Sequence, residues 1–255
     1  MFEDTVVEAD IHPVYTSAGL TDTGRVRPTN QDAFVDRSDA GIWAVADGMG
    51  GHRDGDVASR MVCDALQSFE VRGKLDDVVE QLQQRMSEVN DRLYAAAVRP
   101  VDPVFSGSTV VIMIAQRTSC AFLWAGDSRA YRLRDGKLAQ LTTDHTWASE
   151  LHLEGELGEE ADHAITRAVG GEQTLELAVR RERVRLGDRY LLCSDGLTRE
   201  LTEKQIAEIL GRGAVNETAK ALIDATLAAG ARDNVTVVVI DAGDQTGGDA
   251  AERTS

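Results

Sequence analysis

Extended runs of apolar residues recur near both ends of this chain and through its middle, and they predict a protein rich in β-strands. The Asp135-Gly136 pair between two of the runs indicates a tight hairpin. The predicted strands cover residues 14–20, 33–36, 41–46, 109–115, 119–125, 130–134, 137–141, 176–184, 189–194 and 235–240.

A second pattern, with apolar residues at steps of three and four, predicts amphipathic helices in two pairs. The first pair covers 56–69 and the stretch from Val78 to Leu93. Thr202 begins the second pair with a capping box, and Asn216 is the expected N-cap of a last helix that ends at Gly230. Because helix pairs separate groups of strands, we expect an α+β fold of mainly antiparallel sheets covered by helices.

The length of 255 residues, 42% of them hydrophobic, suits one large domain or two small ones with a sizeable core. Residues 145–163 are polar and weakly patterned, and they indicate an insertion or flap over the rest. Residues 243–255 are small and polar, so we expect a disordered tail there.

The chain is strongly acidic, with a formal net charge of −16. Such a surface repels nucleic acid and anionic lipid, and solubility explains the negative charge better than a specific partner does. Three cysteines without a CxxC pair favour a reducing compartment. The first residues do not resemble a signal peptide, and no apolar run approaches the ~20 residues of a membrane span. We therefore expect a cytoplasmic protein.

Four predicted strands carry an aspartate at one end. Asp47, Asp127 and Asp195 each end an apolar run, and Asp233 comes just before the last one. Two carboxylates about 4 Å apart repel by ~4 kcal/mol at an effective dielectric constant near 20. If the strand ends meet, the cluster needs protons or multivalent cations, and the low pKa of aspartate favours cations at neutral pH.

Oxygen ligands with few histidines or cysteines suit Mg²⁺ or Mn²⁺ and argue against zinc. The alternative for each single aspartate is a turn cap after a strand, which Asp-Gly commonly provides. Because an aspartate recurs at one end of four predicted strands, the sequence favours a metal-dependent hydrolase. We also expect Asp47, Asp195 and Asp233 to lack an arginine or lysine partner, because no basic residue lies at an obvious pairing distance in the sequence.

Eight short segments in order resemble the signature blocks of bacterial PP2C-type (PPM) protein phosphatases, which are metal-dependent Ser/Thr phosphatases. The resemblance extends from about Tyr15 to Ile240. The segments are Arg27-Pro-Thr-Asn-Gln-Asp32, Asp47-Gly-Met-Gly-Gly-His52, Gly107-Ser-Thr109, Gly126-Asp-Ser-Arg129, Thr143-Asp-His145, Ile165-Thr-Arg-Ala-Val-Gly170, Ser194-Asp-Gly196 and Asp233-Asn234.

The resemblance implies a four-layer α-β-β-α sandwich of two mainly antiparallel sheets flanked by helix pairs, with the metal centre between the sheets. It implies one phosphatase domain over residues 13–242, after an N-terminal extension at 1–12. The flap would cover about 145–165, and the disordered tail 243–255.

By position in the blocks, the resemblance implies that Asp47 bridges two metal ions and that the Gly48 carbonyl binds the second. Asp195 and Asp233 would hold the first metal. The ions would be Mn²⁺ or Mg²⁺. A third, weaker ion would fall to Asp127 and Asp195.

Asp32 would sit beside the centre and hold coordinated waters. Gln31 departs from the glutamate that many family members carry, which implies looser affinity for the second metal.

The implied chemistry is the hydrolysis of phosphoserine and phosphothreonine by a water that loses its proton between the metals and attacks phosphorus in line. Arg27 is the candidate phosphate clamp, because guanidinium matches phosphate oxygens, and Arg25 is its rival. His52 is a candidate proton donor to the leaving group; a loop histidine or a water on the third metal are the alternatives. His145 is expected to be structural.

The expected partners are proteins that a Ser/Thr kinase has phosphorylated. The protein itself is expected to be a monomer. The segment from Ile42 to His52 resembles stand-alone phosphatases tied to bacterial secretion systems. Two other functions stay open at this point: a non-catalytic module that binds phosphoproteins, and a phosphatase of small phosphorylated metabolites.

Overall fold

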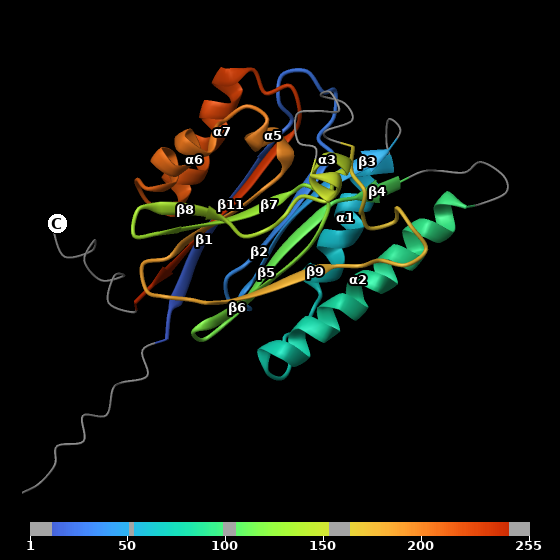
Figure 1. Cartoon of the computed structure of the whole chain (residues 1–255), viewed down its shortest axis with the longest axis horizontal. Helices are drawn as coiled ribbons and strands as arrows, with labels where there is room; N and C mark the ends of the chain where they lie inside the picture. Colours follow the sequence, from blue (N-terminus) through green and yellow to red (C-terminus); the bar gives the residue numbers. More distant parts are fainter. Residues whose placement is uncertain (1–11, 51–53, 99–105, 153–163, 245–255) are drawn as a thin grey trace, which may run out of the picture.

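The computed structural model describes residues 12–50, 54–98, 106–152 and 164–244. Within these ranges the chain forms two β-sheets that pack face to face, with helices on the two outer sides (Figure 1). None of the helices in the described ranges is both long and apolar enough to cross a membrane.

Every pairing between the named strands is antiparallel. One sheet has five strands in the order β1 (Val14–Asp22), β11 (Val235–Gly243), β10 (Arg189–Cys193), β7 (Arg129–Arg134) and β8 (Lys137–Gln140). The other sheet has the order β2 (Asp32–Arg37), β3 (Ile42–Gly50), β5 (Val110–Gln116), β6 (Ser119–Ala125) and β9 (Ala178–Arg183), with β4 (Ser106–Ser108) paired to the end of β3.

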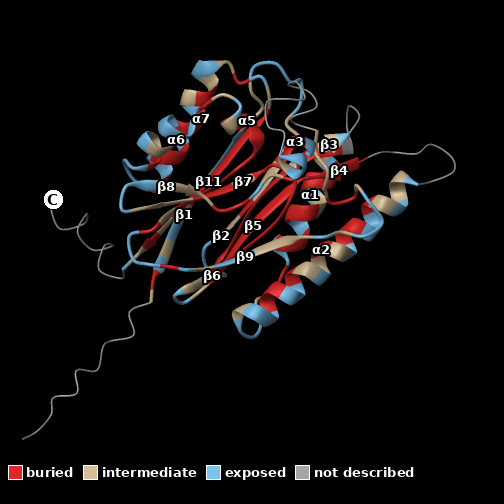
Figure 2. Ribbon diagram, in the orientation of Figure 1, coloured by how far each residue is buried: buried red, intermediate tan, exposed pale blue. Residues whose placement is uncertain are grey.

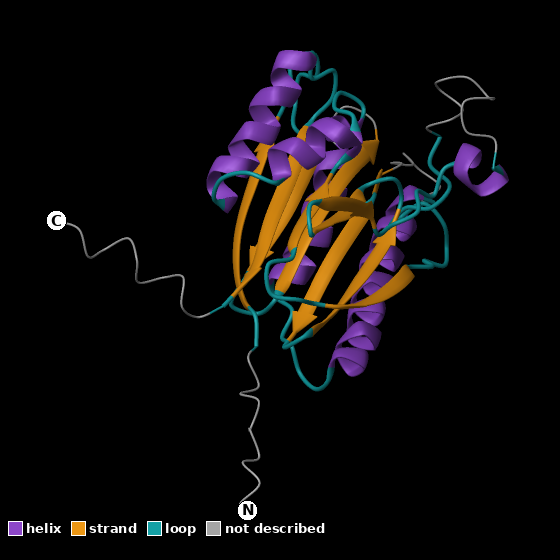
Figure 3. Cartoon of the chain, turned by 60° about the vertical axis from the view of Figure 1, so that its left-hand side comes forward, coloured by secondary structure: helices purple, strands orange, loops and turns teal. Residues whose placement is uncertain are grey.

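Each sheet is covered on its outer face by a pair of helices (Figure 3). The helices α1 (Asp54–Gln67) and α2 (Leu75–Ala97) cover the six-stranded sheet. The five-stranded sheet is covered by α6 (Glu203–Leu210) and α7 (Val215–Ala229). Two short helices, α3 (Trp147–Leu151) and α5 (Asp195–Thr198), lie in the connections. The predicted four-layer α+β sandwich is therefore confirmed.

The core follows from the alternation of side chains along each strand, since successive residues point to opposite faces. In β3, Trp43 and Val45 pack between the two sheets, whereas Ile42 and Ala44 pack against α1 and α2. The last strand shows the same alternation between the inner layer and the outer helices. Both faces of the central strands are therefore buried (Figure 2), which explains why their sequences are continuous apolar runs.

Some boundaries differ from the prediction. The expected N-cap at Asn216 is wrong: α7 begins after Ala214, whose N–H donates to the Glu217 side chain at 3.2 Å. The strand predicted over 41–46 continues as β3 through Gly50, because β4 pairs with its final residues. Asp47 consequently lies inside a strand rather than beyond its end.

Candidate active site

One end of the sandwich gathers aspartates that are far apart in the sequence. Asp32 and Asp47 are directly opposite each other in the register of β2 and β3. Asp195 begins α5 just after β10, and Asp233 comes just before β11, the neighbour of β10. Asp127 lies in the connection between β6 and β7. Both sheets therefore contribute carboxylates to the same region.

A polar cleft with a volume of about 650 Å³ opens at this region. Its lining carries charges of both signs, which suits a charged ligand rather than an apolar one. The lining residues are Arg27, Asp127, Arg129, Asp144, Asp195, Gly196, Thr198, Arg199, Glu200, Arg232 and Asp233.

Two glycines allow the close backbone approaches that bring the aspartates together. A Cβ on Gly48 would lie 1.9 Å from the carbonyl oxygen of Gly55, and a Cβ on Gly196 would lie 1.9 Å from that of Asn234. Real Cβ atoms do not approach so closely, so a side chain at Gly48 would push the end of β3 away from α1, and one at Gly196 would push apart the segments that carry Asp195 and Asp233.

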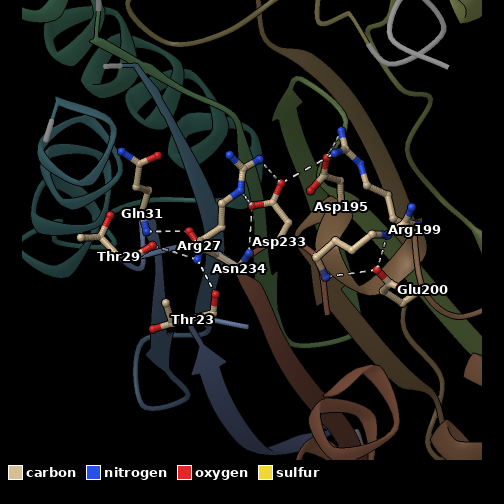
Figure 4. A network of polar contacts seen from close by, with 10 residues as sticks. Thr23, Arg27, Thr29, Gln31, Asp195, Arg199, Glu200, Asp233 and Asn234 are labelled. Carbon is tan, nitrogen blue, oxygen red and sulfur yellow. Dashed lines mark hydrogen bonds and ion pairs between the residues drawn. The ribbon is translucent and has the colours of Figure 1, made fainter. Parts of the chain in front are cut away.

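Hydrogen bonds from the neighbouring strands hold the loop before β2. Asp32 accepts hydrogen bonds from the hydroxyls of Ser194 at 2.8 Å and Thr236 at 2.7 Å. The Asn234 side chain accepts from the N–H of Gln31 at 2.8 Å, and it donates to the carbonyls of Thr23 and Thr29 (Figure 4). The motif residues near Asp32 and Asp233 thus form one connected network across the two sheets.

Burial and mutual repulsion raise the pKa values of three aspartates at the site, Asp32, Asp47 and Asp127. Burial, partly offset by the Ser194 and Thr236 hydrogen bonds, raises the pKa of Asp32 to about 7. Burial and the charge of Asp195 raise the pKa of Asp127 to about 8. Burial, followed by the charges of Asp32, Asp195, Asp127 and Asp233, holds the pKa of Asp47 well above its ordinary value. Positive charge would relieve this repulsion.

Two arginines pair with the aspartates, and this contradicts the expectation that Asp195 and Asp233 lack basic partners. Arg27 donates to both carboxylate oxygens of Asp233, at 2.8 and 2.7 Å. Arg199 forms an ion pair with Asp195 at 2.6 Å and lies 3.7 Å from Asp233 (Figure 4). The sequence signal for Arg199 was its position four residues after Asp195 on a helical turn.

The two candidate phosphate clamps lie in different places. Arg27 lines the cleft, and its side chain is 54% exposed. Arg25, the rival candidate, donates through Nε to the carbonyl of Leu227 near the end of α7, and it does not line the cleft. This geometry favours Arg27.

Of the two histidines considered in the sequence, only His145 lies within the described residues. His52 lies outside the described residues. His145 is 7% exposed, accepts a hydrogen bond from the Gly126 N–H at 3.2 Å and stacks on Trp124 with ring centroids 6.0 Å apart. Burial and the nearby Arg167 lower its pKa, so it is a neutral, structural side chain.

The aspartates predicted as metal ligands fit a hard divalent cation, since their side chains offer carboxylate oxygens. One oxygen of Asp32 and one of Asp127 are buried without a hydrogen-bond partner among the described residues. Among the residues that the structure describes, no group of three or more aspartate, glutamate, histidine or cysteine side chains is already arranged to hold a metal ion. Asp195 and Asp233, the aspartates predicted to hold the first metal, form ion pairs with Arg199 and Arg27.

The two antiparallel sheets, their outer helix pairs and the polar cleft at one end match the architecture that the resemblance to PPM phosphatases implies. The sequence profile of the family described as Protein phosphatase 2C matches residues 25–234, and the chain belongs to this family. The predicted family is therefore confirmed.

Individual relatives agree with the family match. The chain is 37% identical over 230 residues to the serine/threonine protein phosphatase PstP of Mycobacterium tuberculosis, covering 88% of this chain and 44% of PstP. The chain thus spans less than half the length of that relative. It is 34% identical over 235 residues to the serine/threonine phosphatase Stp of Listeria monocytogenes, covering 87% of this chain and 93% of Stp.

Solved structures show the same fold. PppA, described as a key regulatory component of the T6SS in Pseudomonas aeruginosa, matches with a TM-score of 0.86 and 36% identity over 91% of this chain and 99% of PppA. The catalytic domain of PstP in complex with two manganese ions matches with a TM-score of 0.81 and 38% identity over 91% of this chain and 99% of the domain.

Proposed function

We propose that this protein hydrolyses phosphoserine and phosphothreonine in other proteins, using divalent metal ions held by the aspartates of the cleft. The observation that carries the proposal is the gathering of five aspartates from both sheets at one end of the sandwich, beside a polar cleft that Asp127, Asp195, Asp233 and the exposed Arg27 line. The named relatives, which are Ser/Thr protein phosphatases, support the same reaction.

Asp47, the Gly48 carbonyl, Asp195 and Asp233 would hold two Mn²⁺ or Mg²⁺ ions, with Asp32 orienting waters beside them. Asp127 and Asp195 would hold a third. Bound there, such ions supply positive charge for the phosphoryl oxygens and lower the pKa of a coordinated water. The two manganese ions described for the PstP catalytic domain support this part of the proposal.

The side chains of the protein supply orientation. Arg27 would bind the substrate phosphate through two parallel N–H groups, which fixes the phosphorus in line with the attacking oxygen. The Ser194 and Thr236 hydroxyls orient Asp32 by hydrogen bonds at 2.8 and 2.7 Å. Proton donation by His52 to the leaving serine or threonine oxygen stays a prediction.

The reaction should depend on added metal. With Mn²⁺, the protein is expected to hydrolyse both p-nitrophenyl phosphate and a phosphothreonine peptide, and EDTA should abolish both activities because the aspartates alone cannot stabilise the transferring phosphoryl group. Phosphate release, measured with and without EDTA, tests this.

The same assay separates the two other functions. Turnover of neither substrate, with tight peptide binding, would support a phosphoprotein-binding module. Efficient hydrolysis of phosphorylated metabolites alone would support a metabolite phosphatase. Full activity in excess EDTA would overturn the metal-dependent mechanism.

Arg27→Ala is expected to raise KM for a phosphothreonine peptide by about tenfold, because a charge-assisted hydrogen bond to the ground-state phosphate is lost. Steady-state kinetics at saturating Mn²⁺ measures this. Arg25→Ala is the matched control, since it removes the same charge outside the cleft, and its KM should stay within about twofold of wild type. An effect confined to Arg25→Ala would transfer the clamp to Arg25.

We propose a cytoplasmic monomer that opposes a Ser/Thr kinase. The similarity to PppA supports a place beside a secretion apparatus.

A further inference from the structure

Charges of alternating sign form a chain across the cleft (Figure 4). Arg27 pairs with Asp233, Asp233 lies 3.7 Å from Nη1 of Arg199, and Nη2 of Arg199 lies 2.6 Å from Asp195. The guanidinium of Arg199 thus contacts one proposed metal ligand and lies beside a second. A cationic side chain occupies the space between the carboxylates that the first metal would need.

The backbone of Arg199 is anchored, while its side chain reaches into the cleft. Its N–H donates to the Asp195 carbonyl at 2.9 Å. Leu197 and Leu201, on either side, are buried at 0% and 4% exposure. The Arg199 side chain itself is 34% exposed. The guanidinium can therefore change partners without moving the helix that carries Asp195.

The other arginines that line the cleft have carboxylates of their own. Arg129 donates three hydrogen bonds to Asp144. Arg232 pairs with Glu200 at 2.9 Å. Neither Asp144 nor Glu200 belongs to the proposed ligand set. Arg27 and Arg199, in contrast, form ion pairs with proposed metal ligands.

A divalent cation and a guanidinium compete for the same carboxylate oxygens and repel each other at this distance. Metal binding by Asp195 and Asp233 would therefore release Arg199 beside the cation, where a guanidinium needs a new anionic partner. The phosphate dianion of the substrate suits this role, because a guanidinium matches its oxygens bidentately.

We propose that Arg199 is a second phosphate-binding residue, which exchanges its partner from Asp195 to the substrate phosphate when the cleft binds metal. This inference rests on the proposed function, because it assigns Arg199 to the same phosphate. It makes Arg199 a competitor of the metal and a partner of the phosphate. Its removal should therefore change the two affinities in opposite directions.

The test uses the full chain and measures binding rather than turnover. Isothermal titration calorimetry of Arg199→Ala should show Mn²⁺ bound about fivefold more tightly, since a partly exposed ion pair is lost. Inorganic phosphate, titrated into Mn²⁺-saturated protein, should bind about tenfold more weakly or worse. Arg199→Lys keeps the positive charge but loses the two parallel N–H donors of the guanidinium, so it should bind phosphate with intermediate affinity.

Arg232→Ala is the matched control, since it removes an arginine from the lining of the same cleft. Its phosphate affinity should stay within about twofold of wild type. Equal losses of phosphate affinity in the Arg199 and Arg232 variants would show that any positive charge in the cleft has the same electrostatic effect, and they would overturn the proposal. Weaker binding of both Mn²⁺ and phosphate by Arg199→Ala, with a lowered Tm, would show that Arg199 is only structural and overturn it as well.

The inference and the proposed function fail in different ways. If wild type binds neither Mn²⁺ nor phosphate, the proposed function fails. If wild type binds both and Arg199→Ala matches it in both titrations, only the role of Arg199 is wrong.

Discussion

Asp195→Ala is expected to lower kcat at saturating Mn²⁺ by about 10³-fold or more. Asp195 is 8% exposed, begins α5 and is the residue proposed to hold the first metal and to share a third. Metal ions supply several kcal/mol of transition-state charge stabilisation, and each 1.36 kcal/mol corresponds to about tenfold in rate. The loss should persist at high Mn²⁺, because the geometry of the site changes and not only its affinity.

Asp144→Ala is the control for this substitution. Asp144 lines the same cleft and has its own ion pair with Arg129 at 2.7 Å, outside the proposed ligand set. Its kcat should stay within about tenfold of wild type. Phosphate release with p-nitrophenyl phosphate, together with the Tm of each variant, distinguishes lost chemistry from lost folding. A near-normal rate for Asp195→Ala at saturating Mn²⁺ would reject its role as a ligand.

Asp188→Ala is expected to lower the free energy of unfolding by about 3–5 kcal/mol, the cost of removing one partner from a buried ion pair. The Asp188 side chain is 0% exposed and pairs with Arg134, which is 17% exposed. The carboxylate also accepts hydrogen bonds from the Arg185 N–H at 2.7 Å and the Tyr190 hydroxyl at 3.0 Å. Denaturant titration at pH 7 measures the change.

The effect should depend on pH in a specific direction. Burial tends to raise the pKa of Asp188, but hydrogen bonds from Arg134, Arg185 and Tyr190 outweigh it and hold the pKa below its ordinary value. A carboxylate with a lowered pKa contributes its stabilisation above its unfolded pKa of about 3.9 and loses it as the pH falls through the folded value. The difference between wild type and variant should therefore be constant from about pH 8 to 5 and shrink below about pH 4.

Asp224→Ala is the control for stability, since it removes a carboxylate that pairs with Lys220 on the surface of α7. Exposed pairs of this kind contribute ~0.2–1 kcal/mol, so the change should be small. Equal losses from Asp188→Ala and Asp224→Ala would contradict the importance of the buried pair with Arg134.

The location of the site could be predicted because aspartates at strand ends are a local feature. Asp195 and Asp233 flank β10 and β11, and an apolar run that stops at a carboxylate is visible without knowing its neighbours. The ion pairs could not be predicted in the same way. Arg27 and Asp233 are 206 residues apart, and their contact depends on the two sheets being correctly packed.

Short elements were missed for a related reason. A strand of three residues, such as Ser106–Ser108, and a helix of four, such as Asp195–Thr198, are too short to show a period. Long-range contacts maintain them instead, as when β4 pairs with the end of β3. Missing α5 also hid Arg199, whose pairing with Asp195 depends on a helical turn.

The sequence by itself determined the longer strands and helices, the apolar runs that form the core, and the aspartates that lie at the ends of these runs. It also carried the ordered blocks by which the family was recognised. Local periodicity is sufficient for these features, because it depends on neighbours in the chain.

Only the tertiary structure decided the order of strands in the sheets, the close approach of Gly48 to Gly55 and of Gly196 to Asn234, and the pairing of Asp233 and Asp195 with Arg27 and Arg199. The physical reason is that an apolar strand can pack on many partners. Its register and its neighbours are selected by the combined packing of both sheets and both helix layers, a property of the whole fold rather than of any one segment.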